Sequence, residues 1–166
     1  MDAPLALLNR QQKGRLAEII VIATLLSWNF EVFEPEVDDR GVDLIASPDS
    51  GVFYRIQVKG ITGGSYTFLT QRQFDAATNG GRTASLAYVA YVRLDAKSAP
   101  EVFIIPFSAW DDRSPVFTSY HSGKQGQTGE TEYGINYSQK NAPLLEPYRA
   151  DVVLAELSAR RAERSD

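Results

Sequence analysis

Two short stretches decide the fold of this chain: Asp-Arg-Gly-Val-Asp-Leu-Ile-Ala at residues 39–46 and Tyr-Arg-Ile-Gln-Val-Lys-Gly at residues 54–60. Each contains the branched apolar residues that are typical of strands. The residues between them include Ser, Pro, Asp and Gly, which favour turns. We therefore expect an antiparallel hairpin with strands over residues 42–47 and 52–59.

The hairpin predicts a cluster of polar side chains. Because side chains alternate along a strand, Gln57 and Lys59 lie on one face of the second strand, and antiparallel pairing can bring Asp43 beside them. A carboxylate, an amide oxygen and an ammonium group at one strand end can hold a divalent cation together with a phosphate. The cluster is therefore a candidate phosphodiesterase site.

Glu18 interrupts an apolar run in the segment before the hairpin. A carboxylate in such a run is costly to bury without a partner. Two interpretations stay open: Glu18 pairs with Arg15, one helical turn back, or it faces Asp43 and supplies a metal ligand.

The rest of the chain predicts an α/β fold with a mixed sheet flanked by helices. Apolar spacing indicates a first helix, and Thr70 with Gln73 has the spacing of a capping box that opens a second one. The expected elements are helix 9–28, strand 30–33, the hairpin, a break over 60–65, helix 70–78, and strands 86–94 and 102–106. We expect residues 1–108 to form a core and residues 109–166 a variable extension. In that extension, residues 110–143 are polar and turn-rich with room for one irregular hairpin, and residues 151–164 form a helix.

Composition limits the possible functions. The 166 residues include no cysteine, which excludes disulfides and thiolate metal sites, and the formal net charge is −4. An acidic chain is a poor non-specific polyanion binder, although bound cations can neutralise the acids of a metal-dependent nuclease. The N-terminus shows no signal peptide and the longest apolar run, residues 19–26, is too short to span a membrane. We expect a cytoplasmic protein with no membrane partner.

The motifs Asp39-x-Gly41-x-Asp43 and Gln57-x-Lys59 resemble those of the PD-(D/E)xK nuclease superfamily. Glutamine in the third motif position occurs in its Holliday-junction-resolvase-like branch. The surrounding sequence is also similar to group I intron homing endonucleases. The resemblance covers about residues 9–106 and implies a restriction-endonuclease-like core in the order αβββαβ.

The resemblance also implies roles for individual residues. Asp43 would be the central metal-binding carboxylate, and the carbonyl oxygen of Gln57 would complete the metal shell where most members carry an acid. Lys59 would orient or deprotonate the attacking water and stabilise charge on phosphorus. Glu18 would supply a further ligand, and Asp39 is a weaker candidate. The implied cofactor is Mg²⁺ or Mn²⁺.

The leading functional hypothesis is a metal-dependent DNA endonuclease. The alternative is a catalytically inactive nuclease-fold module for DNA binding or protein interaction, which the acidic charge and Gln57 favour. Weaker DNA contacts are expected from four arginines and two aromatic residues, namely Arg15, Arg55, Arg72, Arg82, Tyr66 and Phe68. Cutting both strands of a duplex needs two sites or sequential nicking, so we also expect a homodimer or a higher even oligomer. Crowding of Asp38, Asp39 and Asp43 near Glu18 further predicts that replacing Asp43 relieves repulsion.

Overall fold

The computed structural model describes residues 5–36, 41–48, 51–79, 81–82, 84–95, 98–112, 114–121 and 129–162. Asp38 and Asp39 lie outside the described residues. In chain order the elements are α1 (Arg10–Ser27), β1 (Glu31–Phe33), β2 (Leu44–Ser47), β3 (Tyr54–Thr62), β4 (Tyr66–Thr70), α2 (Gln71–Thr78), β5 (Ala87–Leu94), β6 (Glu101–Pro106), β7 (Phe117–His121), β8 (Thr131–Asn136) and α3 (Ala150–Ala162).

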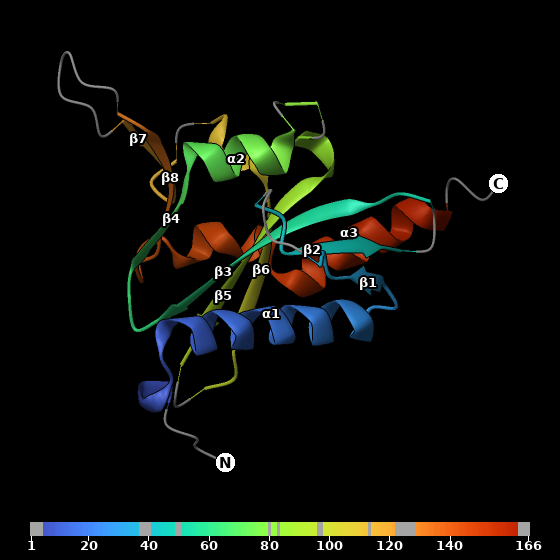
Figure 1. The fold of residues 1–166 in the computed structure, drawn as a ribbon, viewed down its shortest axis with the longest axis horizontal. Coiled ribbons are helices and arrows are strands. Elements are labelled where there is room, and N and C mark those ends of the chain that lie inside the picture. Colours follow the sequence, from blue (N-terminus) through green and yellow to red (C-terminus); the bar gives the residue numbers. More distant parts are fainter. Residues whose placement is uncertain are drawn as a thin grey trace.

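The larger sheet has five strands in the order β1-β2-β3-β5-β6 (Figure 1). Strand β2 pairs antiparallel with both β1 and β3, which confirms the predicted hairpin. Strand β5 pairs parallel with β3 and antiparallel with β6. The mixed sheet and its flanking helices confirm the predicted α/β class and the restriction-endonuclease-like order of elements.

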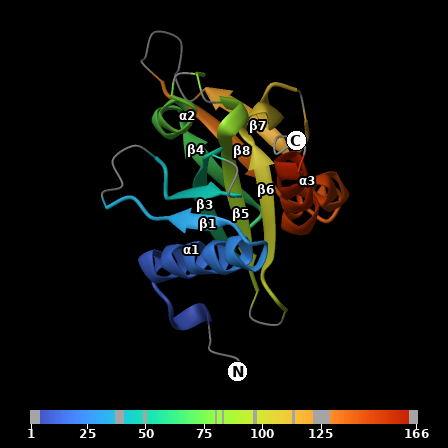
Figure 2. The ribbon, with the colours of Figure 1, turned by 90° about the vertical axis from the view of Figure 1, so that its right-hand side faces the viewer.

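Two separate cores cover the two faces of this sheet. Helices α1 and α3 pack on one face, against residues that include Ile56 and Val58 of β3. Helix α2 and the smaller sheet pack on the other face, against residues that include Val89 and Tyr91 of β5. Figures 1 and 2 show α1 and α2 on opposite sides of the strands. Since Gln57 alternates with Ile56 and Val58, it belongs to the face that α2 covers.

Capping boxes fix the start of both α1 and α2. At α1, Asn9 Oδ1 accepts from the Gln12 backbone N–H and Gln12 Oε1 accepts from the Asn9 N–H, both at 2.9 Å. At α2, Thr70 and Gln73 exchange the equivalent bonds at 3.3 and 3.2 Å, as predicted. Within the described ranges, no helix has both the length and the hydrophobicity to cross a membrane.

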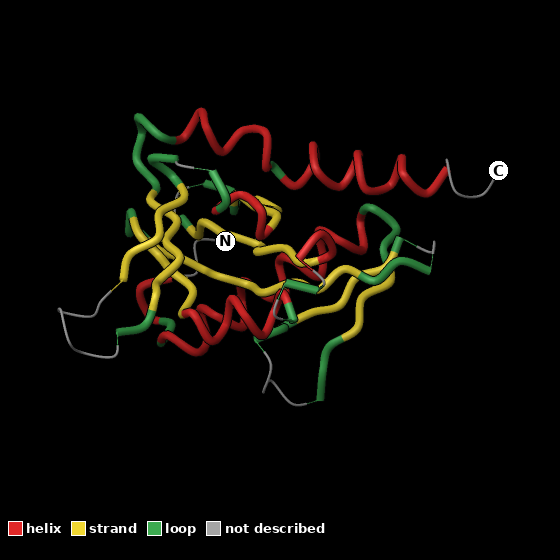
Figure 3. The backbone as a smooth tube through the Cα atoms, turned by 90° about the horizontal axis from the view of Figure 1, so that it is seen from above, coloured by secondary structure: helices red, strands yellow, loops and turns green. Residues whose placement is uncertain are grey.

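A second sheet has three antiparallel strands in the order β4-β8-β7, and lies at one end of the larger sheet (Figure 3). The predicted end of the hairpin strand at Lys59 is wrong, because β3 stays paired with β5 as far as Thr62. Strand β4 has no counterpart in the predicted elements. Its partner β8, and β7, which pairs with the other edge of β8, come from the polar region 110–143. The division into a core and an extension at residue 108 stays a prediction.

Candidate active site

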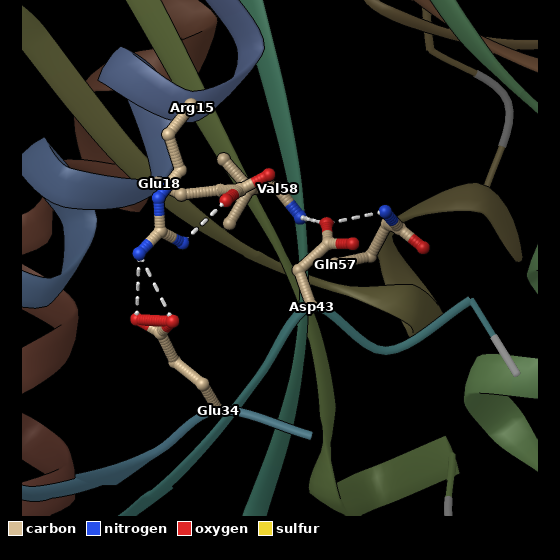
Figure 4. Close-up of polar contacts among 6 residues, drawn as sticks. All are labelled: Arg15, Glu18, Glu34, Asp43, Gln57 and Val58. Atoms are coloured by element: carbon tan, nitrogen blue, oxygen red, sulfur yellow. Dashed lines mark hydrogen bonds and ion pairs between the residues drawn. The ribbon is translucent and has the colours of Figure 1, made fainter. Parts of the chain in front are cut away.

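The site is built where β2 begins, beside the middle of β3. The Asp43 backbone N–H donates to the Ile56 carbonyl at 2.9 Å, so Asp43 is held against β3 just before β2 starts. Its Oδ2 accepts from Gln57 Nε2 and from the Val58 backbone N–H, each at 2.5 Å (Figure 4). The predicted contact between Asp43 and Gln57 is therefore present in the structure.

Gln57 carries a buried oxygen that accepts no hydrogen bond from the described residues. The side chain is only 4% exposed, and no group in the described part of the chain donates to Oε1. The oxygen lies near Gly41, where a Cβ atom would come within 3.3 Å of both Gln57 Oε1 and Gln73 Cα. Gly41 has φ +60°, which also favours glycine at this turn. A side chain at position 41 would thus crowd this oxygen.

Lys59 lies on the same face of β3 as Gln57 and reaches helix α2. Its Nζ donates to Gln73 Oε1 at 3.3 Å. The same Oε1 accepts from the Thr70 backbone N–H in the capping box, so the start of α2 positions the lysine. From the sequence, Gln73 is predicted only as a capping residue. Its second role could be found only by knowing that α2 begins beside β3.

Glu18 belongs to a different set of contacts. Its carboxylate pairs with Arg15 at 2.8 Å, and Arg15 also pairs with Glu34 at 3.0 Å (Figure 4). Hydrogen bonds to Glu18 and then to Glu34 raise the pKa of Arg15 above its usual value. The contact between Glu18 and Arg15 is thus the one of the first interpretation, in which Arg15 compensates the acid. A ligand role for Glu18 stays a prediction.

The four predicted DNA-contacting arginines occupy different environments. Arg15 is in the ion pairs just described, and Arg55 donates to the Ala76 carbonyl at 3.0 Å. Arg72 and Arg82 are exposed. None of the four lines the groove beside Lys59, and their contacts with DNA stay predictions.

A groove of about 750 Å³ runs beside Lys59, between the start of α1 and strand β4. Two cations of α1, Arg10 and Lys13, line it on one side, and Tyr66 and Phe68 line it on the other. Sequence reasoning missed Arg10 and Lys13, because only the fold brings the first turn of α1 next to β4. Burial and the negative charge of Glu132 raise the pKa of Tyr66, so its hydroxyl stays protonated at neutral pH.

The described residues contain no group of three or more His, Cys, Asp and Glu side chains that could hold a metal ion. The donors at the site are the Asp43 carboxylate and the unpartnered Gln57 carbonyl oxygen. Oxygen ligands of this kind suit Mg²⁺, which often uses one or two carboxylates and keeps several waters.

The site residues fall within a known sequence family. A family model described as PD-(D/E)XK endonuclease matches residues 8–93, a segment that includes Glu18, Asp43, Gln57 and Lys59. No curated protein sequence matches the chain significantly.

Among solved structures, the chain is similar to a bacterial homing endonuclease, I-Ssp6803I, with a TM-score of 0.52 and 14% identity over 93% of this chain and 98% of that one. It is also similar to Hjc, a Holliday junction resolvase of Archaeoglobus fulgidus, with a TM-score of 0.49 and 14% identity over 80% and 88% of the two chains. At such identities the first likeness shows the fold alone. The family match covers more than half of the sequence: the chain belongs to the PD-(D/E)XK endonuclease family, which supports a nuclease function.

Proposed function

We propose that this chain is a divalent-metal-dependent DNA endonuclease with Asp43, Gln57, Lys59 and Glu18 in its active site. One observation carries the proposal: the buried Gln57 Oε1 has no partner among the described residues, although it lies in the side chain that contacts Asp43. A buried acceptor without a hydrogen bond costs about 1–3 kcal/mol. Such atoms are rare in folded proteins, and a bound cation would give this one a partner.

The donor set fits Mg²⁺ or Mn²⁺. Asp43 would supply the carboxylate, Gln57 its carbonyl oxygen, and Glu18 a further ligand. These are the hard oxygen donors that both cations prefer. When bound, the cation would act as a Lewis acid on the scissile phosphate.

In this proposal Lys59 acts on the reacting groups and Gln73 positions Lys59. Gln73 Oε1 accepts from Lys59 Nζ and holds the ammonium group on the Gln57 face of β3. An ammonium group placed there before the reaction stabilises the negative charge that develops on the phosphoryl oxygens, and can orient the attacking water. Because the lysine is already positioned, little reorganisation is needed when the charge forms.

A second candidate function is that of a nuclease-fold module without catalysis. Gln57 stands where most members of the superfamily carry an acid, so the site has one negative charge fewer. The described residues contain no group of three His, Cys, Asp or Glu side chains that could hold a metal ion, and the net charge of the chain is −4. Both facts favour the module without catalysis. Such a module would bind DNA or a protein without cutting DNA.

Cleavage assays separate the two functions. Supercoiled, branched and single-stranded DNA, with RNA for comparison, are incubated with Mg²⁺ or Mn²⁺. We expect Lys59→Ala to lower the cleavage rate by about 10²–10³-fold, since it removes one group that stabilises the transition state, and to leave DNA binding largely intact. Lys140→Ala, at an exposed lysine outside the groove, is the matched control.

Two results contradict the proposal. A Lys59→Ala variant that cuts as fast as the wild type removes the proposed role of the lysine. A wild type that binds DNA but cuts no substrate with either cation supports the module without catalysis.

Assembly is also a proposal. A domain of this size carries one site, so we expect a homodimer or a higher even oligomer in order to cut both strands of a duplex. Contacts are expected through α3 or through residues 110–143. Light scattering that shows a monomer with full double-strand cleavage would remove this argument.

A further inference from the structure

We propose that the outer face of the smaller sheet binds unpaired DNA bases, which makes DNA with a single-stranded segment the preferred substrate of the neighbouring site. We call this surface the aromatic face and define it by Tyr66, Phe68 and Tyr120. The inference rests on the proposed function for its cutting step. The binding step that it adds can be tested without cleavage.

Strand register places the three rings on one side of the sheet. Phe68 of β4 lies opposite Gly134 of β8, and Gly134 lies opposite Thr118 of β7. One step along the same face, Glu132 lies opposite both Thr70 and Tyr120. Directly opposite residues share a face, and so do residues two apart on one strand. Tyr66, Phe68 and Tyr120 therefore share a face.

The opposite face of the smaller sheet is part of the protein core. Leu69, Phe117 and Ile135 are buried there, and Tyr133 stacks on Phe74 of α2 with ring centroids 3.8 Å apart. The aromatic face is thus the face turned away from α2.

The three rings on the aromatic face are accessible to a ligand. Tyr66 is 44% exposed, Phe68 39% and Tyr120 63%. Tyr66 and Phe68 stack on each other with centroids 6.1 Å apart and planes inclined by 30°. Tyr66 lies across the sheet over Gly134, where a Cβ atom would come within 2.5 Å of its ring and hydroxyl. A glycine at this position lets the ring lie flat.

Positive charge adjoins the rings. Arg10 and Lys13 line the groove that Tyr66 and Phe68 also line, and Lys59 lies in its wall. Neither Arg10 nor Lys13 forms an ion pair with any described residue. Glu132 is an acid on the aromatic face, and its charge disfavours phosphates there. Phosphates are therefore favoured along the α1 side of the groove and bases along the β4 side.

This arrangement is suited to unpaired bases. Inside a duplex each base is stacked on both sides, and its π-face is closed to a protein ring. A single strand offers open base faces, which aromatic side chains cover while cations follow the backbone. The groove has both parts, and it leads to Lys59 at the candidate active site.

The test is a binding measurement on the full chain in EDTA, where cleavage cannot occur. Fluorescence anisotropy compares an oligo-dT single strand with a duplex of equal length. We expect Tyr66→Leu and Phe68→Leu each to weaken single-strand binding by about 5–100-fold and duplex binding by less than about twofold. Lys13→Gln should lower the salt slope for the single strand by about 0.7. The matched control is Phe53→Leu, because Phe53 is 52% exposed and pairs with Phe33, outside the groove.

A second measurement needs no variant. Ultraviolet crosslinking of a bromodeoxyuridine single strand to the wild type should place crosslinks in the peptide that contains residues 66–68. Variants that weaken single-strand and duplex binding equally, or not at all, overturn the inference. So do crosslinks confined to other peptides. Loss of single-strand binding in EDTA by the Tyr66 and Phe68 variants, with duplex binding kept, supports this inference whether or not the wild type cleaves DNA, which separates it from the cleavage proposal.

Discussion

Two polar clusters next to β3 contain carboxylates, and they differ in burial and in pairing. In the first, Asp43 accepts from Gln57, which is 4% exposed and keeps an oxygen without a partner in the described part of the chain. In the second, Arg15 bridges Glu18 and Glu34, and the Arg15 and Glu34 side chains are 53% and 43% exposed. The second cluster is satisfied as it stands. The first has unused hydrogen-bonding capacity in a place where water has little access.

This difference separates a candidate functional site from an ordinary surface feature. Exposed ion pairs are common and contribute little to stability, whereas buried acceptors without partners are rare. By the number of acids alone, the Arg15 cluster would be the stronger candidate for a functional site, because it holds two carboxylates. By burial and hydrogen-bond pairing, the cluster of Asp43 and Gln57 is the stronger candidate.

The largest expected effect belongs to Asp43→Ala. Gln57 Nε2 and the Val58 N–H both lose an acceptor, so the free energy of unfolding should fall by about 1–3 kcal/mol. This direction is opposite to the relief of repulsion inferred from the sequence. Mg²⁺ at a hundredfold excess over its dissociation constant should stabilise the wild type by about 2.7 kcal/mol and the variant not at all. Thermal melts with and without Mg²⁺ measure both effects.

A variant that melts above the metal-free wild type would show that repulsion dominates at Asp43. Equal stabilisation of both proteins by Mg²⁺ would place the cation elsewhere.

Gln57→Leu should have a smaller effect on folding. The substitution removes a hydrogen bond to Asp43, but it also removes the unpartnered oxygen, so the free energy of unfolding should change by less than about 1 kcal/mol. The stabilisation by Mg²⁺ should be reduced. Gln57→Glu is the matched variant: it places a second carboxylate beside Asp43, so it should be less stable than the wild type in EDTA and gain more from Mg²⁺. Chemical denaturation under both conditions checks this, and a Gln57→Leu variant with the full Mg²⁺ response would contradict the ligand role.

The smallest effects are expected for Glu18 and Glu34, the two acids that pair with Arg15. Glu18→Gln and Glu34→Gln each remove one exposed ion pair, and neither should change the melting temperature appreciably. If Glu18 is a metal ligand, Glu18→Gln should weaken Mn²⁺ binding by about 10-fold while Glu34→Gln leaves it unchanged. Titration calorimetry measures both. Equal Mn²⁺ affinities in the two variants would assign Glu18 to the ion pair alone.

Much of the larger sheet could be predicted from sequence, because its elements have strong local signals. The apolar spacing of α1, the capping box at Thr70 and the turn between β2 and β3 each depend on neighbouring residues. Strand β4 could not be found in this way. Its sequence, Tyr-Thr-Phe-Leu-Thr, follows the turn-forming residues Gly63, Gly64 and Ser65, and its partner β8 comes from a polar region that shows no clear strand pattern.

The contact between Asp43 and Gln57 could also be predicted, since it follows from hairpin pairing and alternation. The partner of Lys59 could not. Gln73 Oε1 meets the lysine only because α2 begins beside β3, and that placement depends on packing across the sheet. Arg10 and Lys13 could not be predicted for a similar reason. They belong to α1, and only the fold brings α1 to the side of the groove that faces β4.

The pairing of Tyr66 with Asn136 also has a consequence for the order of assembly during synthesis. All five strands of the larger sheet, and every residue of the candidate active site, have been made once the ribosome has passed Pro106. Strand β4 must then wait for β8, and contacts between segments so far apart in sequence are slow to form. In a growing chain, the residues proposed to cut DNA are therefore made before the surface proposed to choose it is complete.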